Sequence, residues 1–245
     1  MKKITFSFLL TLASITFSFA QLGLPVGGGS SVTGAVCTEG QVYTWGLNKQ
    51  GGVSGTLGVG TTTQNEPLPK QVIFPVGITI QQLGAGSGGF FMALDCNQKV
   101  WSWGGNDGGQ LGVGDKTSRA TPQKVLVQAG SPVDIAGFRD PVTGQLQKIS
   151  KLFAGNSSSL AITDDGRLLA WGCNSGSCDP AAPGILGNGS TTDALYPTFV
   201  IDGATNQPLE NVIDMSIGDH LAMALVDVNQ EGMKKYAVAG VPFFE

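Results

Sequence analysis

The stretch VWSWGGNDGGQLGVGD at residues 100–115 decides the fold, because its main features recur twice more along the chain. Residues 42–48 read VYTWGLN and are followed by LGVG at 57–60. Residues 168–174 read LLAWGCN and are followed by LGNG at 186–189. Self-similarity at a regular spacing is the sequence signature of a repeat architecture. We therefore interpret the chain as successive copies of one unit.

The surroundings of each Trp-Gly segment repeat as well. A polar turn such as Asp165-Gly166 precedes the strand that ends in Trp-Gly, and a proline follows each Leu-Gly pair. The Trp-to-Trp spacings are 58 and 68 residues, and a further 68 residues lead to Ala239, in a copy where alanine replaces the tryptophan. The predicted repeats cover approximately residues 29–75, 78–130, 148–205 and 211–245.

These residues resemble the regulator of chromosome condensation (RCC1-like) repeat family. Its pattern combines an Ala-Leu pair, an acidic-Gly turn, a Tyr-x-Trp-Gly-x-Asn strand end and a Gly-Gln-Leu-Gly loop. The resemblance covers about residues 29–245, although only His220 keeps the family histidine and only Gln110 keeps the glutamine before leucine. It implies an all-β fold, a β-propeller of seven blades, each built from parts of two successive repeats. Three full copies and a degenerate fourth predict a partial propeller. Either two chains complete one ring, or the usual repeat count of the family is not met, or the chain is a fragment, which is the interpretation we favour.

Composition agrees with an all-β fold. The 37 glycines and short alternating segments suit many short strands joined by tight turns, since glycine adopts positive φ without a steric cost. In a propeller, each tryptophan is predicted to wedge between neighbouring sheets, with the leucine of Leu-Gly anchoring the following loop. We therefore predict structural rather than ligand-binding roles for the following residues: Trp45, Trp103, Trp171, Leu57, Leu111, Leu186 and His220.

Residues 1–20 have the character of a secretory signal peptide. Lys2 and Lys3 begin a mostly apolar segment that ends in Ser18-Phe19-Ala20. We expect cleavage after Ala20, a repeat domain at residues 21–245, and secretion or display at the cell surface of a bacterium. No later segment is long and apolar enough to predict a transmembrane helix.

The charge balance restricts the partners. Loss of Lys2 and Lys3 with the leader lowers the basic count from 14 to 12 against 18 acidic residues, which gives a net charge of −6. An acidic chain without a basic cluster is a poor nucleic-acid binder, because phosphate neutralisation supplies most of that affinity. We predict no nucleic-acid partner and no insertion into a membrane.

Catalytic and cofactor motifs are weak. The glycines of residues 84–89 fall in a repeat turn rather than before a helix, so they do not predict a dinucleotide site. His220 is the only histidine, and no Gly-x-Ser-x-Gly segment accompanies it. We predict no cofactor, no metal site and no enzymatic activity.

The four cysteines predict one disulfide. Cys173 and Cys178 lie in one loop, and in an exported chain a disulfide between them is the expected state. Cys37 and Cys96 fall near equivalent repeat positions, and the sequence leaves open whether they pair or stay free.

The predicted function is that of an exported, non-enzymatic protein-binding module. Loops on one face of a propeller form a broad surface, and the best candidates are the longer inserts at 47–56, 137–147 and 173–185. Open sheet edges also predict self-association. One alternative is a secreted carbohydrate-active or lectin-like domain. The other is guanine-nucleotide exchange, which the family resemblance suggests and the acidic, exported character disfavours.

Overall fold

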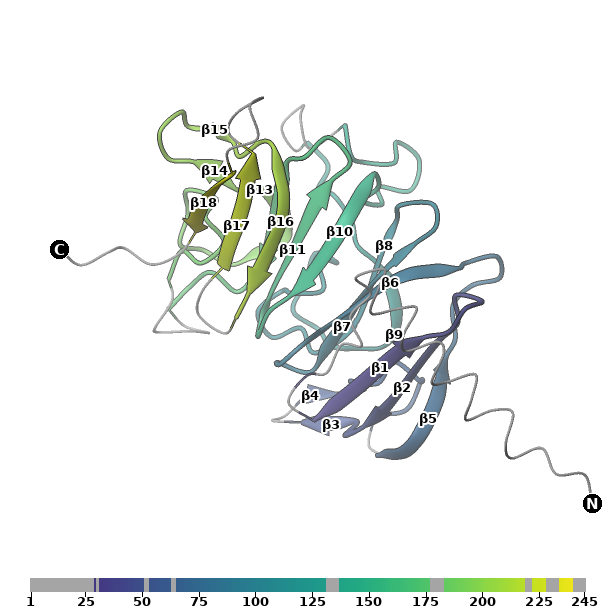
Figure 1. The fold of residues 1–245 in the computed structure, drawn as a ribbon. Coiled ribbons are helices and arrows are strands. Elements are labelled where there is room, and N and C mark those ends of the chain that lie inside the picture. Colours follow the sequence, from purple (N-terminus) through teal and green to yellow (C-terminus); the bar gives the residue numbers. More distant parts are fainter. Residues whose placement is uncertain are drawn as a thin grey trace, which may run out of the picture.

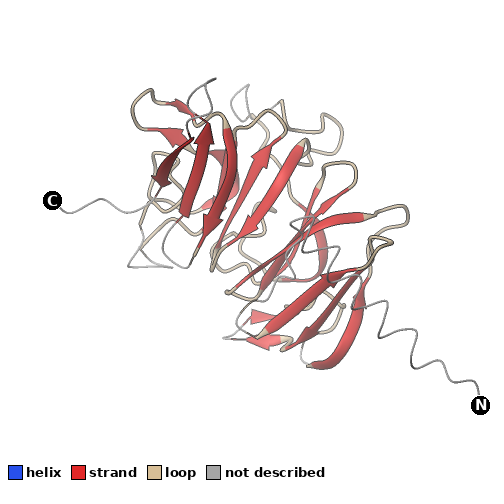
Figure 2. Cartoon of the chain, viewed as in Figure 1, coloured by secondary structure: helices blue, strands red, loops and turns tan. Residues whose placement is uncertain are grey.

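The structure is a computed structural model that describes residue 29 and residues 31–50, 53–62, 65–130, 137–176, 183–218, 222–227 and 234–239. These residues form small antiparallel sheets that follow one another as a fan (Figure 1), and every element in them is a strand, turn or loop (Figure 2). The predicted signal peptide, His220 and Cys178 lie outside the described residues.

Four sheets carry the fold. The first contains β1 (Val32–Val36), β2 (Val42–Gly46) and β5 (Glu66–Val72). The second contains β6 (Ile80–Gly86), β7 (Phe90–Asp95), β8 (Val100–Gly104) and β9 (Arg119–Lys124). The third contains β10 (Ile149–Ala154), β11 (Ser158–Thr163), β12 (Leu168–Gly172) and β13 (Ala194–Phe199). The fourth contains β16 (Val212–Ile217), β17 (Ala222–Asp227) and β18 (Lys234–Ala239).

Two short hairpins complete the described elements. They are β3 (Lys49–Gln50) with β4 (Val53–Ser54), and β14 (Ile201–Asp202) with β15 (Gln207–Pro208).

The registers show that the sheets are copies of one blade. Val32, Phe90 and Ser158 each lie opposite the glycine that ends a Trp-Gly strand, so β1, β7 and β11 are equivalent. The strand before β7 is β6, and the strand before β11 is β10, and these are the inner strands of their blades. Within the described ranges, the first sheet has no strand equivalent to β6.

The inner strands bind each other across the blades. The amide of Gln82 in β6 donates to the carbonyl of Leu152 at 2.9 Å and accepts from its N–H at 3.1 Å. The equivalent residue in β10 is Lys151, whose Nζ donates to the Ile213 carbonyl at 2.8 Å and lies 3.2 Å from Asp214 Oδ1. One position of the repeat thus joins each described inner strand to the next.

Trp103 and Trp171 fill the seams between blades. Both are completely buried, and each indole lies on the glycine of the Leu-Gly pair from the preceding blade. A Cβ built on Gly58 would lie 2.3 Å from Trp103, and one on Gly112 would lie 2.8 Å from Trp171 Nε1. Both glycines also have positive φ, so the close approach and the turn both require glycine.

Trp45 differs from the other two tryptophans. It is only partly buried, although the sequence predicts the same wedge as for Trp103 and Trp171. Each of these indoles faces the preceding blade, and the structure describes no blade before the first sheet. Within the described residues Trp45 therefore fills no seam, because they offer it no neighbouring sheet.

The repeated prolines lie on the outermost strands. Pro67 and Pro69 are in β5, Pro122 is in β9 and Pro197 is in β13. Proline has no N–H to donate, so it is accommodated at a sheet edge and weakens that edge as a template for another strand.

Candidate functional site

The propeller presents two faces. The strands β2, β8 and β12 end on what we call the loop face, which carries the segments 47–65, 105–118 and 173–193. Neighbouring strands are antiparallel, so β5, β9 and β13 end on the opposite side. We call this side the turn face; it carries the hairpin turns after β1, β7 and β11 and the segments that connect one blade to the next.

The three predicted binding inserts do not share a face. Residues 47–56 follow β2 and residues 173–185 follow β12, so both lie on the loop face. Residues 137–147 lie between β9 and β10, so they lie on the turn face. The interpretation of these inserts as one surface is therefore wrong: strand direction within a blade separates them, and the repeat spacing alone does not reveal strand direction.

On the loop face, one buried asparagine per repeat fixes each loop. The Oδ1 atoms of Asn48, Asn106 and Asn174 accept the N–H of Leu57, Leu111 and Leu186, each at 2.9 Å. Their Nδ2 atoms donate to backbone carbonyls further along the loop, at 2.9 Å to Thr61, 2.8 Å to Asp115 and 2.8 Å to Ser190. We call this arrangement the asparagine clamp. These asparagines belong to the repeated motif, but the sequence alone predicts no role for them.

The leucines of the Leu-Gly pairs anchor the loops in the core. Leu57, Leu111 and Leu186 are buried. The hydroxyls of Thr44 and Ser102 also donate to the carbonyls of Leu57 and Leu111, each at 2.7 Å.

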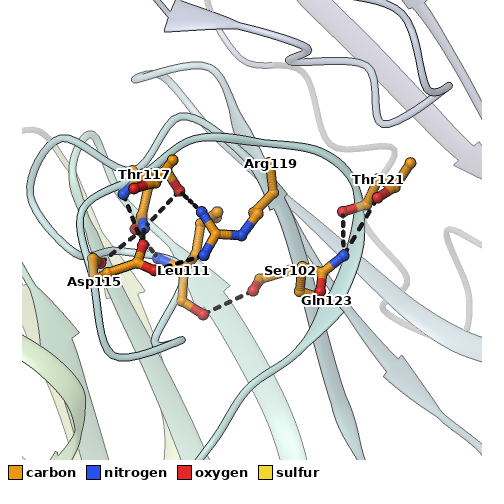
Figure 3. A network of polar contacts seen from close by, with 8 residues as sticks. Ser102, Leu111, Asp115, Thr117, Arg119, Thr121 and Gln123 are labelled. Atoms are coloured by element: carbon orange, nitrogen blue, oxygen red, sulfur yellow. Dashed lines mark hydrogen bonds and ion pairs between the residues drawn. The ribbon is translucent and has the colours of Figure 1, made fainter.

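A polar network closes the loop after β8 (Figure 3). Arg119 Nη2 lies 2.6 Å from Asp115 Oδ2, and a second guanidinium nitrogen donates to the Thr117 carbonyl. The hydrogen bond from Arg119, followed by that from the Thr117 N–H, holds the pKa of Asp115 below its ordinary value. Because these contacts join the loop to Arg119, the first residue of β9, they explain how the loop is held and indicate no ligand.

Asp193 joins the loops of two blades. Its carboxylate lies 2.6 Å from Lys116 Nζ and accepts the N–H groups of Asn174 at 2.8 Å and Ser175 at 2.9 Å. Burial alone would raise the pKa of Asp193, but the Lys116 and backbone hydrogen bonds outweigh it, and the pKa lies below its ordinary value.

We expect this carboxylate to stabilise the fold in a pH-dependent way. A depressed pKa in the folded state stabilises above the unfolded value of about 3.8, and that contribution disappears as the pH falls through the lower, folded value. Urea unfolding should show Asp193→Asn to be less stable than the wild type at pH 7. The difference should shrink as the pH is lowered below 3.8. A difference that grows on acidification would contradict the assignment.

On the turn face, the insert 137–147 is packed rather than free. Phe138 and Leu146 are buried, and Phe138 packs edge-on against Phe199. The Arg167 guanidinium covers both rings, at 4.8 and 5.0 Å from their centroids. The tip, formed around Asp140, leaves Val142 in solvent. The insert thus presents one apolar side chain on a rigid base.

Exposed apolar side chains gather in the connections on the turn face. Ile73 and Val76 lie between β5 and β6, and Val142 lies between β9 and β10. Their exposed fractions are 71%, 105% and 90%. Large exposed apolar side chains are the kind of surface that protein partners cover.

The turn face also contains a cavity of about 680 Å³ where the inner strands meet. We call it the axial pocket; its lining comes from the turn after β1, from β6, β10 and β16, and from Leu94 and Cys96. Both Cys37 and Cys96 line this pocket, and both are free thiols. The sequence left their pairing open. It did not predict the pocket, because the lining residues come from four different sheets.

Cys173 is buried, and Cys178 lies outside the described residues, so the disulfide between them stays a prediction. The described part of the chain contains no group of three or more His, Cys, Asp or Glu side chains arranged for a metal ion. No helix within it has the length and apolar character of a membrane span.

Comparison with known proteins assigns the family. The family model for the regulator of chromosome condensation (RCC1) repeat matches residues 39–93, 97–162 and 165–225. The chain belongs to the RCC1 repeat family. The RCC1 units are staggered against the blades, since the unit at 39–93 contributes β2 and β5 to the first sheet and β6 to the second.

Curated relatives are much longer than this RCC1-repeat chain. It is 29% identical over 200 residues to the human E3 ubiquitin-protein ligase HERC2, a match that covers 81% of this chain and 4% of HERC2. It is 32% identical over 161 residues to the ultraviolet-B receptor UVR8 of Arabidopsis thaliana, covering 65% of this chain and 30% of the receptor.

Among solved structures, Prp20p from Saccharomyces cerevisiae has the same fold. The TM-score is 0.58 at 19% identity, and the match covers 84% of this chain and 44% of Prp20p. Prp20p is described as binding Gsp1p and histones, and it has also been solved in complex with Kap60.

Proposed function

We propose that this chain is a non-enzymatic protein-binding module that engages its partner through the turn face. The observation that carries the proposal is the location of Ile73, Val76 and Val142 on the same face as the axial pocket. Among the described residues, they are the most exposed large apolar side chains of the inter-blade connections. Apolar anchors on rigid connections are favourable for binding, because little conformational freedom is lost when they are covered.

Family relatives support a protein partner. The RCC1 protein Prp20p is described as binding Gsp1p, histones and Kap60. The excess of 18 acidic over 14 basic residues favours a neutral or basic protein surface over nucleic acid. Guanine-nucleotide exchange remains an analogy with the family, and no contact in the described residues favours it.

The carbohydrate-active alternative has less support. Glycoside hydrolysis uses a pair of carboxyl groups that flank the scissile bond. Among the residues that the structure describes, one carboxylate lines the axial pocket, that of Asp214, and it pairs with Lys151.

The test is a pull-down with the full chain and two matched variants. A protein retained by the wild type should be retained about tenfold less by Ile73→Asp/Val142→Asp, since the loss of apolar anchors costs more than about 1 kcal/mol. Leu68→Asp is the control, because Leu68 is 74% exposed but lies on the outer strand β5. Equal retention by the double variant would refute the turn-face proposal, as would an equal loss with Leu68→Asp.

We also propose export, based on the leader-like residues 1–20, with a Cys173–Cys178 disulfide. Denatured, exported protein should then begin at Gln21 and show two alkylatable thiols before reduction and four after it. A retained leader or four thiols before reduction would contradict this.

Self-association is proposed for the sheet edges that lack proline. The outer strands β5, β9 and β13 each contain proline. The inner edge strands β6, β10 and β16 are joined to one another by side-chain hydrogen bonds across the blades, so β1 and β18 are the edges that remain in the four described sheets. Sedimentation that shows a monomer at every concentration would refute it.

A further inference from the structure

The floor of the axial pocket is apolar. Ile80 and Leu94 are buried beneath it, and Phe153 is partly buried at its side. Phe153 in β10 offers apolar surface to the hollow, and Ile80 in β6 and Leu94 in β7 are almost fully buried below it. Such a floor favours an occupant with an apolar body.

Among the described lining residues, the rim of the pocket is polar and carries no unpaired charge. The exposed side chains of Thr38, Thr79, Gln81 and Ser150 line it with hydroxyl and amide groups. Lys151 and Asp214 are the charged residues that line it, and they lie 3.2 Å apart. A charged occupant would lose its hydration without a free counter-ion, which is costly. The rim therefore favours an uncharged occupant that can form a hydrogen bond.

Hydrogen bonds between strands hold the wall of the pocket in place before any occupant binds. The two hydrogen bonds between the Gln82 amide and Leu152 lock β6 to β10, and Lys151 locks β10 to the backbone of β16. Gly40 closes against Thr79 and Ile80, and its carbonyl accepts the Ile80 N–H at 3.0 Å. An occupant would enter a preformed cavity, and a volume of about 680 Å³ is within the range of pockets that bind ligands.

We propose that the axial pocket is an anchor site for a tyrosine or tryptophan side chain of the protein partner. This inference rests on the proposed protein-binding function. Tyrosine and tryptophan combine a large apolar ring with one polar tip, as the floor and the rim require. They are also enriched among the residues that contribute most to protein interfaces.

The free thiols of the pocket provide the assay. Cys37 and Cys96 both line it, so an occupant should shield them from alkylation by N-ethylmaleimide, measured for each thiol by mass spectrometry. The probes are N-acetyl-L-tryptophanamide and N-acetyl-L-tyrosinamide, with N-acetyl-L-lysinamide and N-acetyl-L-alaninamide as controls. At a probe concentration about ten times its Kd, alkylation should slow about tenfold, by mass action.

A plug variant tests the same site without a probe. Gln81 is exposed and lines the pocket, so Gln81→Trp should place an indole in it, slow alkylation of both thiols and abolish protection by the aromatic amides. The matched controls are Gln81→Ala and Gln71→Trp; Gln71 is an exposed residue of the outer strand β5 and does not line the pocket. Both control variants should show the wild-type rate of thiol alkylation and the wild-type protection by the aromatic amides.

Two results would overturn the proposal. One is alkylation of wild-type Cys37 and Cys96 that aromatic amides do not slow, and the other is equal protection by the lysine or alanine amide. These results come from the wild-type chain, so they stand whether or not the plug variant folds. They also leave the turn-face test intact, because Ile73 and Val142 do not line the pocket.

Discussion

Trp171→Ala should lower the free energy of unfolding by about 4 kcal/mol, in the range measured for buried aromatic truncations. Trp171 is completely buried, lies on Gly112 of the preceding blade and donates from Nε1 to the Gln110 carbonyl at 2.9 Å. The alanine variant would leave a cavity in the seam, and it would also leave that carbonyl without its indole donor. Urea unfolding followed by far-ultraviolet circular dichroism measures the loss.

Two comparisons separate burial from hydrogen bonding at the seams. Trp45→Ala should lower the free energy of unfolding by less than half as much as Trp171→Ala, because Trp45 is only partly buried. Trp171→Phe should cost about 1 kcal/mol for the lost hydrogen bond. Trp103→Phe should cost less than Trp171→Phe, since Trp103 Nε1 is buried without a hydrogen-bond partner. Equal losses for Trp45→Ala and Trp171→Ala would contradict the seam assignment.

Asn106→Ala should destabilise the protein by about 3 kcal/mol, because several buried backbone groups would lose their partner at once. Asn106 accepts the Leu111 N–H at 2.9 Å and donates to the carbonyls of Asp115 at 2.8 Å and Thr117 at 3.0 Å. The variant should also lose hydrogen-exchange protection in residues 105–118 before the rest of the second sheet.

The control for the asparagine clamp is Asn97→Ala. Asn97 is exposed in the turn after β7, and replacing its side chain should change the free energy of unfolding by less than about 0.5 kcal/mol. If hydrogen exchange in Asn106→Ala rose equally throughout the second sheet, the clamp would support the whole blade rather than its loop.

The sequence predicts the strands and the repeated packing well. Trp-Gly marks the end of β2, β8 and β12, and the leucine positions fall in the buried loop anchors. These features could be predicted because each depends on a local pattern that recurs. The seam role of Trp103 and Trp171 also follows from the size and regular spacing of the side chains.

Features that depend on the assembled blades could not be predicted. Trp45 has the same local sequence as Trp103 but a different exposure, because burial depends on a neighbouring sheet. The asparagine clamp is visible as a recurring Asn, yet its partners lie at variable distances along loops of different length. The axial pocket combines Thr38, Gln81, Ser150 and Asp214, which no periodicity brings together.

The stagger between RCC1 units and blades has a consequence for how such proteins change in evolution. Because the unit at residues 39–93 links the first sheet to the second, duplication of one unit by recombination adds a whole blade and leaves every interior strand with neighbours on both sides. The number of blades can therefore rise or fall one at a time. Only the contact between the first and the last blade, which closes the ring, has to change.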